Sequence, residues 1–290
     1  MNMMAIERPV QAAARSPGGP QLTVLGGSGF VGRALTEHAR GLALPCQAPA
    51  RGAQALWHEP LGHVIYTVGL TADFRVRPLE TIEAHVCLLR RLIAEADFES
   101  LTYLSSTRVY AGGSDTRETA NLSVNPNDPS DLYNLSKLTG EALCLHAGRP
   151  GMKVARLSNV IGLRRDPDTF VDQLLLEAQR TGKAVMQTAP EARKDYIALD
   201  DVVALLTRIA MSDVSGIFNV ASGESVANST IASMLGEVLG IPVETAPNPA
   251  RWDFSPIDIG RVRTAFNFTP RPFVTHFPQF LADYRQQKGT

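Results

Sequence analysis

Tyr133 and Lys137 stand four residues apart in a segment that predicts a helix over residues 131–147. At that spacing both side chains lie on one face of the helix. A free tyrosine has a pKa of about 10 and is a poor base at neutral pH, but a nearby ammonium stabilises the phenolate. The pair could therefore move a proton to or from a substrate oxygen; the plain alternative is a surface Tyr–Lys pair.

Ser106 could act together with this pair, because it follows a strand predicted at residues 101–104. Open α/β sheets bind their ligands at the carboxyl ends of their parallel strands. A hydroxyl at that place can hydrogen-bond the same oxygen whose proton the tyrosine handles. Ser106, Tyr133 and Lys137 are therefore the candidate catalytic residues.

Three glycines, Gly26, Gly29 and Gly32, form a G-x-x-G-x-x-G pattern between a strand predicted at residues 21–25 and a helix that follows at once. Such glycines allow a turn with positive φ, close approach to a pyrophosphate and tight packing of the helix on the strand. The N-terminus of the helix then offers free N–H groups to the phosphates. The pattern predicts dinucleotide binding; the alternative is a plain tight turn.

The segment after a second predicted strand, residues 42–47, bears on the choice of cofactor. An acid there binds the ribose 2′-hydroxyl of NAD, whereas a base suits the 2′-phosphate of NADP. This segment has no acid, and it ends in Arg51. We expect NAD or NADP, with a lean to NADP; the alternative is that Arg51 is a solvated loop residue and NAD binds without an acid.

Composition excludes several other classes of protein. The 290 residues are 44% apolar and carry 28 Lys+Arg against 29 Asp+Glu, which excludes a disordered chain and disfavours nucleic-acid or membrane partners. The three cysteines form no CxxC pair, so we expect a reducing cytoplasm and no thiolate metal site. Residues 1–20 lack the apolar core of a secretory signal, and they are expected to form a flexible tail.

The predicted elements alternate between strands and helices, which indicates a parallel sheet covered on both faces. Strands are predicted at residues 21–25, 42–47, 63–68, 101–104 and 153–157, and helices at 79–96, 131–147, 169–181, 202–209 and 229–239. The fold class is α/β, a Rossmann-type doubly wound parallel sheet with a smaller C-terminal substrate-binding lobe. The expected boundaries are 21–162 for the NAD(P)-binding domain and 163–290 for most of the lobe, with 195–222 returning to the sheet.

Six sequence blocks occur in a characteristic order: GGSGFVG, SSTRVY, YNLSK, ARLSNVIG, KDYIALDDV and GIFNVASGES. With them the chain resembles the extended short-chain dehydrogenase/reductase family, the NAD-dependent epimerases and dehydratases of nucleotide sugars. The resemblance implies that Tyr133 is the acid/base, Lys137 the ribose ligand that tunes it, and Ser106 its hydroxyl partner. The cofactor residues that it implies are Gly26, Ser28, Gly29, Phe30, Val31, Gly32, Gly69, Tyr133 and Lys137, to which the charge argument adds Arg51.

The resemblance also points to residues that face the substrate. Asn159, Lys194 and Arg251 are candidates for contacts with a nucleoside diphosphate, because two phosphates need fixed donors and cations. For Lys194 and Arg251 the alternative is an ordinary surface charge. A further set follows the strand at residues 63–68 and could shape the sugar pocket: Tyr66, Leu70, Thr71, Asp73 and Arg75.

Three departures from the family pattern limit the expected chemistry. Thr107 and Arg108 occupy the places where dehydratases carry an Asp-Glu pair, so 4,6-dehydration is not expected. His85 stands where the family commonly has Asn, and we assign it no catalytic role. The segment at residues 51–63 is too short for the usual additional strand, and Trp57 could substitute there in packing on adenine or could only be core.

The sequence thus predicts an NAD(P)-dependent nucleotide-sugar epimerase or 4-ketoreductase that transfers a hydride at a sugar carbon. The expected partners are a nucleoside diphosphate sugar and a second copy of the chain in a homodimer. Two alternatives stay open: a reductase of a non-sugar ketone on the same fold, or a dinucleotide-sensing protein without turnover.

Overall fold

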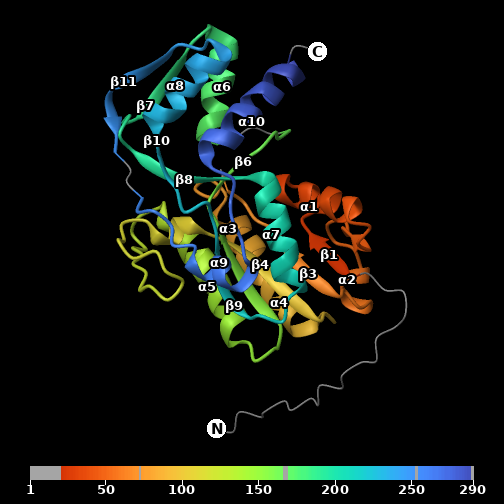
Figure 1. Ribbon diagram of the computed structural model, residues 1–290. Helices are drawn as coiled ribbons and strands as arrows, with labels where there is room; N and C mark the ends of the chain where they lie inside the picture. The colour runs from red at the N-terminus through yellow and green to blue at the C-terminus, as the bar shows by residue number, and fades with distance from the viewer. Residues whose placement is uncertain (1–20, 72, 166–168, 252–253, 289–290) are drawn as a thin grey trace.

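The computed structural model describes residues 21–71, 73–165, 169–251 and 254–288 (Figure 1). The tail predicted at residues 1–20 lies outside the described residues. Figure 1 shows two parts: a sheet with helices on both sides, and a smaller lobe built from the later half of the chain. Within the described residues, every helix is too short or too polar to span a bilayer.

A six-stranded sheet of parallel strands forms the larger part, in the order β2-β1-β3-β4-β5-β9. Its strands are β1 (Leu22–Leu25), β2 (Cys46–Gln47), β3 (His63–Tyr66), β4 (Ser100–Ser106), β5 (Met152–Leu157) and β9 (Gly216–Val220). A parallel sheet has to be covered on both faces, which explains the nearly continuous burial of these strands. The predicted fold class is confirmed.

Each face of the sheet has its own apolar core. Helices α1 (Phe30–Gly41) and α7 (Leu199–Met211) cover one face, and α4 (Leu88–Glu95) and α5 (Asp131–His146) cover the other. Shorter elements complete this part: α2 (Ala55–His58), α3 (Pro78–Ile82), a π-helical turn (Glu83–Cys87), a 3-10 turn (Thr107–Tyr110) and α9 (Gly260–Phe266).

The smaller lobe contains two short sheets, β10-β8-β6 and β11-β7, with helices packed on them. Its elements are β6 (Asn159–Ile161), α6 (Phe170–Thr181), β7 (Ala184–Thr188), β8 (Arg193–Ala198), β10 (Ser225–Ala227), α8 (Asn228–Leu239), β11 (Val243–Ala250) and α10 (Phe273–Lys288). Stacked Phe273 and Phe277 lie at its centre. Helix α6 begins at a capping box in which Thr169 and Asp172 satisfy each other's backbone N–H groups.

The chain passes between the two parts more than once. Strand β9 pairs with β5, and α7 packs on α1 and the sheet, so residues 199–220 lie with the larger part. Helix α9 then packs on β9, a second return that the sequence did not indicate. The lobe is therefore interleaved with the sheet rather than appended to it, and β8 runs between the two parts (Figure 1).

The structure departs from the predicted elements at two places. Strand β2 is two residues long, because α1 continues to Gly41 and Ala43 then adopts a positive φ of 52° that turns the chain. Residues 48–62 hold α2 and no strand, so β2 is the edge of the sheet. The helix predicted at residues 79–96 contains the π-helical turn Glu83–Cys87.

The order of the strands fixes where a ligand can bind. β2 lies on one side of β1, whereas β3 and all later strands of the sheet lie on the other. A crevice opens at the carboxyl ends of the strands where the order reverses, which here lies between β1 and β3. The glycine turn follows β1 directly, so it stands at this crevice.

A buried ion pair joins α5 to the sheet. Arg156 on β5 donates two hydrogen bonds to the carboxylate of Glu141 on α5, at 2.9 and 2.6 Å, and both side chains are almost fully buried. The guanidinium also donates to Tyr110 Oη at 2.7 Å, and Ser105 Oγ donates to the same carboxylate. The network connects β4, β5 and α5 directly behind the crevice.

Removal of one partner should leave an uncompensated buried charge. We expect Arg156→Met to lower the free energy of unfolding by about 3–5 kcal/mol, measured by urea denaturation. The matched control is Arg117→Met, whose guanidinium pairs with Asp115 on the exposed surface. A loss of stability no larger than that of the control would contradict the importance of the network.

Candidate active site

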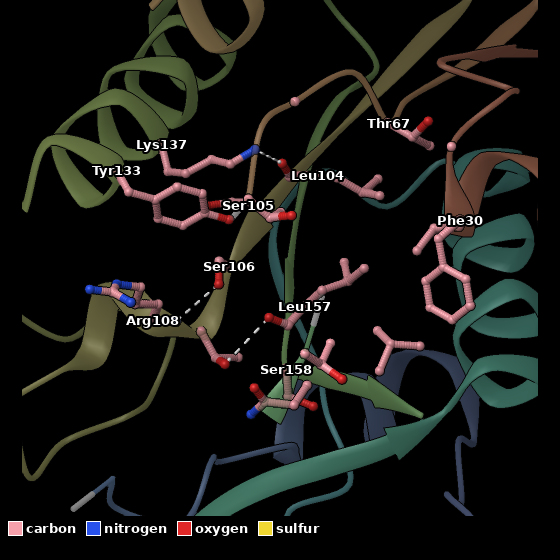
Figure 2. Close-up of a pocket in the computed structure, with 18 of the residues that line it drawn as sticks. Phe30, Thr67, Leu104, Ser105, Ser106, Arg108, Tyr133, Lys137, Leu157 and Ser158 are labelled. Carbon is pink, nitrogen blue, oxygen red and sulfur yellow. Dashed lines mark hydrogen bonds between the residues drawn. The ribbon is translucent and has the colours of Figure 1, made fainter. Parts of the chain in front are cut away.

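A pocket of about 680 Å³ opens at the crevice and extends to the lobe. Its walls come from the glycine turn, the ends of β3, β4 and β5, helix α5, and strands β6 and β8. Figure 2 shows Tyr133 and Lys137 reaching from α5 toward the end of β4, with Phe30 and Thr67 on the opposite side. The pocket therefore joins the predicted cofactor turn to the predicted catalytic residues.

Tyr133 is buried beside Ser106 and Arg108. Burial raises the pKa of the phenol, while the neighbouring Ser106 hydroxyl and the positive charge of Arg108 oppose that rise. Ser106 Oγ also accepts the backbone N–H of Arg108 at 3.2 Å, which begins the 3-10 turn and fixes the serine side chain. The two hydroxyls thus lie together at the end of β4, able to share one substrate oxygen.

Lys137 lies on the same face of α5, one turn further along. Its Nζ donates to the carbonyl of Leu104 at 2.9 Å and lies 5.1 Å from the centre of the Tyr103 ring. Burial lowers the pKa of Lys137 to about 7, although the nearby Glu141 carboxylate favours the charged form. The ammonium has donors left over for a ligand, because it makes a single hydrogen bond to the described residues.

Helix α5 can come this close to β4 because residue 140 is glycine. A Cβ at Gly140 would lie 2.5 Å from atoms of the Tyr103 side chain. Without that Cβ, the aromatic ring packs directly on the helix backbone, and the side chains of the preceding turn reach the strand. The side chains of Ser105 and Ser106 point to different partners: Ser105 bonds Glu141 in the core, and Ser106 faces the pocket.

His85 supports the catalytic helix from the π-helical turn. Its Nε2 accepts the backbone N–H of Leu70 at 3.2 Å, and its Nδ1 lies 2.8 Å from Ser136 Oγ, which donates to the carbonyl of Tyr133 at 2.8 Å. These partners require a neutral ring that carries its proton on Nδ1. Burial and the charge of Lys137 lower the pKa of His85 to about 3, which agrees with the neutral form.

The glycine turn has the close contacts that a pyrophosphate cradle needs. Gly26 has a φ of 90°, and a Cβ at Gly32 would lie 2.2 Å from the carbonyl oxygen of Gly26. The helix starts at Phe30 without a side-chain cap, so the N–H groups of its first turn remain available to a ligand. At the other end of the cofactor path, a Cβ on Gly69 would crowd His85. The residues present therefore fit a dinucleotide.

The lobe side of the pocket is rich in donors. Asn159 donates from Nδ2 to the backbone carbonyl of Asp195 at 2.8 Å, and Lys194 lies half-buried beside it. The carboxylate of Asp195 is already engaged, since it accepts hydrogen bonds from the N–H groups of Ser222 and Gly223 at 3.0 and 2.7 Å. It is the sole carboxylate among the described residues that line this pocket.

The structure brings most of the predicted site residues together. Those that line the pocket are Ser28, Gly29, Phe30, Val31, Gly32, Gly69, Ser106, Tyr133, Lys137, Asn159 and Lys194. Gly26 lies directly beneath the turn, against Gly32 and Thr67. Arg51 and Arg251 are exposed, in the turn after β2 and just past β11, and do not line it.

Among the loop residues expected to shape the sugar pocket, Thr71 and Arg75 line it. The prediction for Tyr66 was wrong. Side chains alternate along the strand, so its ring points into the core, where its hydroxyl donates to the carbonyl of Ala84. The sequence did not indicate Phe74, whose buried ring packs 5.3 Å from that of Tyr133. No sequence signal singled it out, because the same loop also carries the apolar Leu70 and Val76.

Comparisons with known proteins show what the chain is similar to. The family model described as the NAD dependent epimerase/dehydratase family matches residues 22–221. The chain is 26% identical to dTDP-6-deoxy-L-talose 4-dehydrogenase (NAD(P)(+)) of Kitasatospora kifunensis, over 87% of this chain and 91% of that protein. It is also 26% identical to GDP-6-deoxy-D-mannose reductase of Pseudomonas aeruginosa, over 80% of this chain and 84% of that protein. Among solved structures, MoeE5 in complex with UDP-glucose and NAD has a TM-score of 0.79 at 21% identity, covering 94% of this chain and 100% of that one.

The cradle predicts a clear difference between two glycines of one helix. In Gly32→Ala the new Cβ would strike the backbone of Gly26, so α1 must shift, at a cost of about 1–3 kcal/mol of stability. We expect affinity for NAD+ or NADP+, measured by calorimetry, to fall at least about tenfold. Gly41→Ala is the control, because a Cβ there meets nothing within 4 Å. Equal affinities in the two variants would contradict the assignment.

His85 predicts a pH dependence of stability. Its folded-state pKa of about 3 lies below the ordinary 6.5, so the unfolded chain binds the extra proton between these values and acid favours unfolding. His85 should therefore cost up to about 1.4 kcal/mol of stability for each pH unit below about 6.5.

The His85 effect is isolated by comparing wild type with His85→Leu in urea titrations at pH 7 and pH 5. The stability advantage of wild type over the variant should shrink by up to about 2 kcal/mol at pH 5. His58→Leu, at an exposed histidine of α2, should show no such change. An advantage independent of pH would show that His85 is not held neutral.

Proposed function

The chain belongs to the NAD dependent epimerase/dehydratase family, and on that premise we propose that it is an NAD(P)-dependent nucleotide-sugar epimerase or 4-ketoreductase. The family expected from the six sequence blocks is confirmed, and its members among the relatives are NAD(P)-dependent enzymes of the extended short-chain dehydrogenase/reductase type. The proposal concerns the reaction and the residues that carry it.

One observation carries the proposal: Ser106, Tyr133 and Lys137 line one wall of the pocket, with Ser106 next to the Tyr133 phenol and Lys137 one turn further along α5 (Figure 2). The glycine turn lines the other side of the same pocket. A dinucleotide bound at the turn can therefore reach Ser106 and Tyr133. That combination suits the exchange of a hydride and a proton at one carbon that bears oxygen.

Each residue has a distinct part in the proposed reaction. Tyr133 donates a proton to the substrate oxygen during reduction and accepts it during oxidation, while Ser106 holds that oxygen in place. Lys137 binds the ribose and, when charged, favours the phenolate form of Tyr133. Bound NAD or NADP supplies the hydride donor or acceptor. Phe74 packs on Tyr133 and keeps water from the ring.

The site favours redox chemistry over elimination of water. An elimination needs a base to remove a proton from the neighbouring carbon, but Asp195 is the sole carboxylate among the described lining residues. Its oxygens are held by Ser222 and Gly223. This supports an epimerase or reductase over a dehydratase.

The substrate and cofactor follow from the donors around the pocket. Asn159 and Lys194 are the proposed contacts for a nucleoside diphosphate on the lobe side. A Cβ on Gly27 would touch Ala48, so the segment that leads to Arg51 passes beside the glycine turn, which supports the lean to NADP. We further propose a homodimer in which α5 takes part.

Replacement of one phenol should separate binding from turnover. We expect Tyr133→Phe to keep its affinity for NAD(P)+ but to lose turnover about 100-fold or more, since it cannot transfer a proton. Turnover is followed by absorbance of the reduced cofactor and by NMR of dTDP-, UDP-, GDP- and CDP-sugars. Cofactor retained through purification would indicate an epimerase, and cofactor released at each turnover a reductase.

Tyr196→Phe is the matched control. Tyr196 lies on β8 in the lobe core and does not line the pocket, and its buried hydroxyl has no hydrogen-bond partner among the residues that the structure describes. Its variant should turn over like wild type. Unchanged turnover in Tyr133→Phe would contradict the proposed acid/base, and wild type that binds no dinucleotide would contradict the proposed function as a whole.

A further inference from the structure

Two arginines converge on the reacting end of the pocket. The guanidinium carbon of Arg75 lies 4.5 Å from the centre of the Phe74 ring, and that of Arg108 lies 5.6 Å from the same centre. Phe74 in turn packs on Tyr133. Figure 2 shows Arg108 next to Ser106 and Tyr133, at the end of the pocket opposite to Phe30. We call Arg75 and Arg108 the arginine pair.

The arginine pair has excess positive charge. Neither member, nor Lys194 nearby, has a carboxylate within 4.0 Å among the described residues. The buried Nε of Arg108 has no hydrogen-bond partner in the described part of the chain, whereas Arg75 donates to the uncharged Ser130 at 2.9 Å. By contrast, Arg156 elsewhere in the molecule is paired with an acid.

Electrostatics agrees with this geometry. Burial is the largest cause and Arg75 the next in lowering the pKa of Arg108, and burial followed by the charge of Arg108 lowers that of Lys194. The carboxylates of Asp128 and Asp131, at the start of α5, act on Arg108 only through space. Asp131 is committed to Asn125 and Asn134 at 2.8 and 2.7 Å.

A half-buried guanidinium without an acid is costly to the folded protein unless an anion completes it. A planar guanidinium binds a carboxylate through two parallel hydrogen bonds, and the low-dielectric wall formed by Phe74 strengthens such bonds. We propose that the arginine pair binds a carboxylate carried by the reacting sugar, so that the substrate is a nucleotide-linked sugar acid. This inference rests on the proposed function and names its substrate class.

The position of Arg108 indicates that the anion it binds is the sugar carboxylate and not the diphosphate. Arg108 follows Ser106 by two residues, its N–H bonds the serine hydroxyl, and its charge acts directly on Tyr133. The diphosphate of a nucleotide sugar is attached at C1, across the ring from C4, whereas the carboxyl of a uronic acid is attached to C5, next to C4. An anion at the reacting oxygen is therefore the one on the sugar.

The test compares sugars that differ at C6 alone: UDP-glucuronic acid with UDP-glucose, and GDP-mannuronic acid with GDP-mannose, with UDP and GDP as references. Calorimetry is carried out with saturating NAD+ in the Tyr133→Phe background, in which turnover is slowed about 100-fold or more. In at least one pair the acid should bind about 10- to 100-fold more tightly than the neutral sugar. Adding Arg108→Met should bring that ratio close to one, and Arg108→Lys should keep part of it.

Arg117→Met is the control, because this arginine is exposed, paired with Asp115 and outside the pocket. Acids that bind no more tightly than their neutral partners in either pair would overturn the inference. So would an Arg108→Met that weakens acid, neutral sugar and free nucleotide alike, since the arginine would then bind the diphosphate. Failure to bind NAD+, or to turn over any nucleotide sugar, would instead contradict the proposed function.

Discussion

The active site depends on the close approach of helix α5 to strand β4. Glycine at position 140 lets the helix backbone lie against Tyr103, and this places Lys137 within 2.9 Å of the carbonyl of Leu104. Glu141, four residues after Lys137 on the same helix, is bound by the buried guanidinium of Arg156. The helix is thus fixed to the sheet by packing, by a lysine and by an ion pair. Only with α5 in this position does a tyrosine one turn earlier meet a serine at the strand end.

The site combines polar groups that have hydrogen-bond partners within the protein with polar groups that have donors to spare. His85 is satisfied on both ring nitrogens and stays neutral, so it supports Tyr133 without charge of its own. Asp195 is likewise satisfied by backbone N–H groups. Lys137 retains unused donors at the pocket, and Arg108, which also lines it, has no carboxylate within 4.0 Å among the described residues. Unmet donors beside a buried phenol are what distinguish a binding surface from a structural network.

Much of this could be read from the sequence, because the relevant signals are local. The glycine turn and the Tyr133–Lys137 spacing each depend on a few neighbouring residues, and the structure brings both to one pocket. The π-helical turn could not be predicted, because its residue His85 contacts Ser136, which is far from it in sequence. Strand β2 was overestimated, since an apolar run after a helix also fits a turn. The positive charge of the arginine pair is uncompensated because the described carboxylates lie more than 4.0 Å away. Such a distance depends on the fold and cannot be predicted from a sequence pattern.

The central claim is that a hydride leaves or joins the carbon whose oxygen Ser106 and Tyr133 hold. The most direct measurement uses a nucleotide sugar that turns over, labelled with deuterium at C4, with enzyme in excess and mass spectrometry of the cofactor and sugar at successive times within a single turnover. The account predicts that deuterium leaves C4 for the cofactor during oxidation and, in an epimerase, returns to the same carbon. Product that forms with deuterium never appearing in the cofactor, or with label lost to solvent, would contradict it.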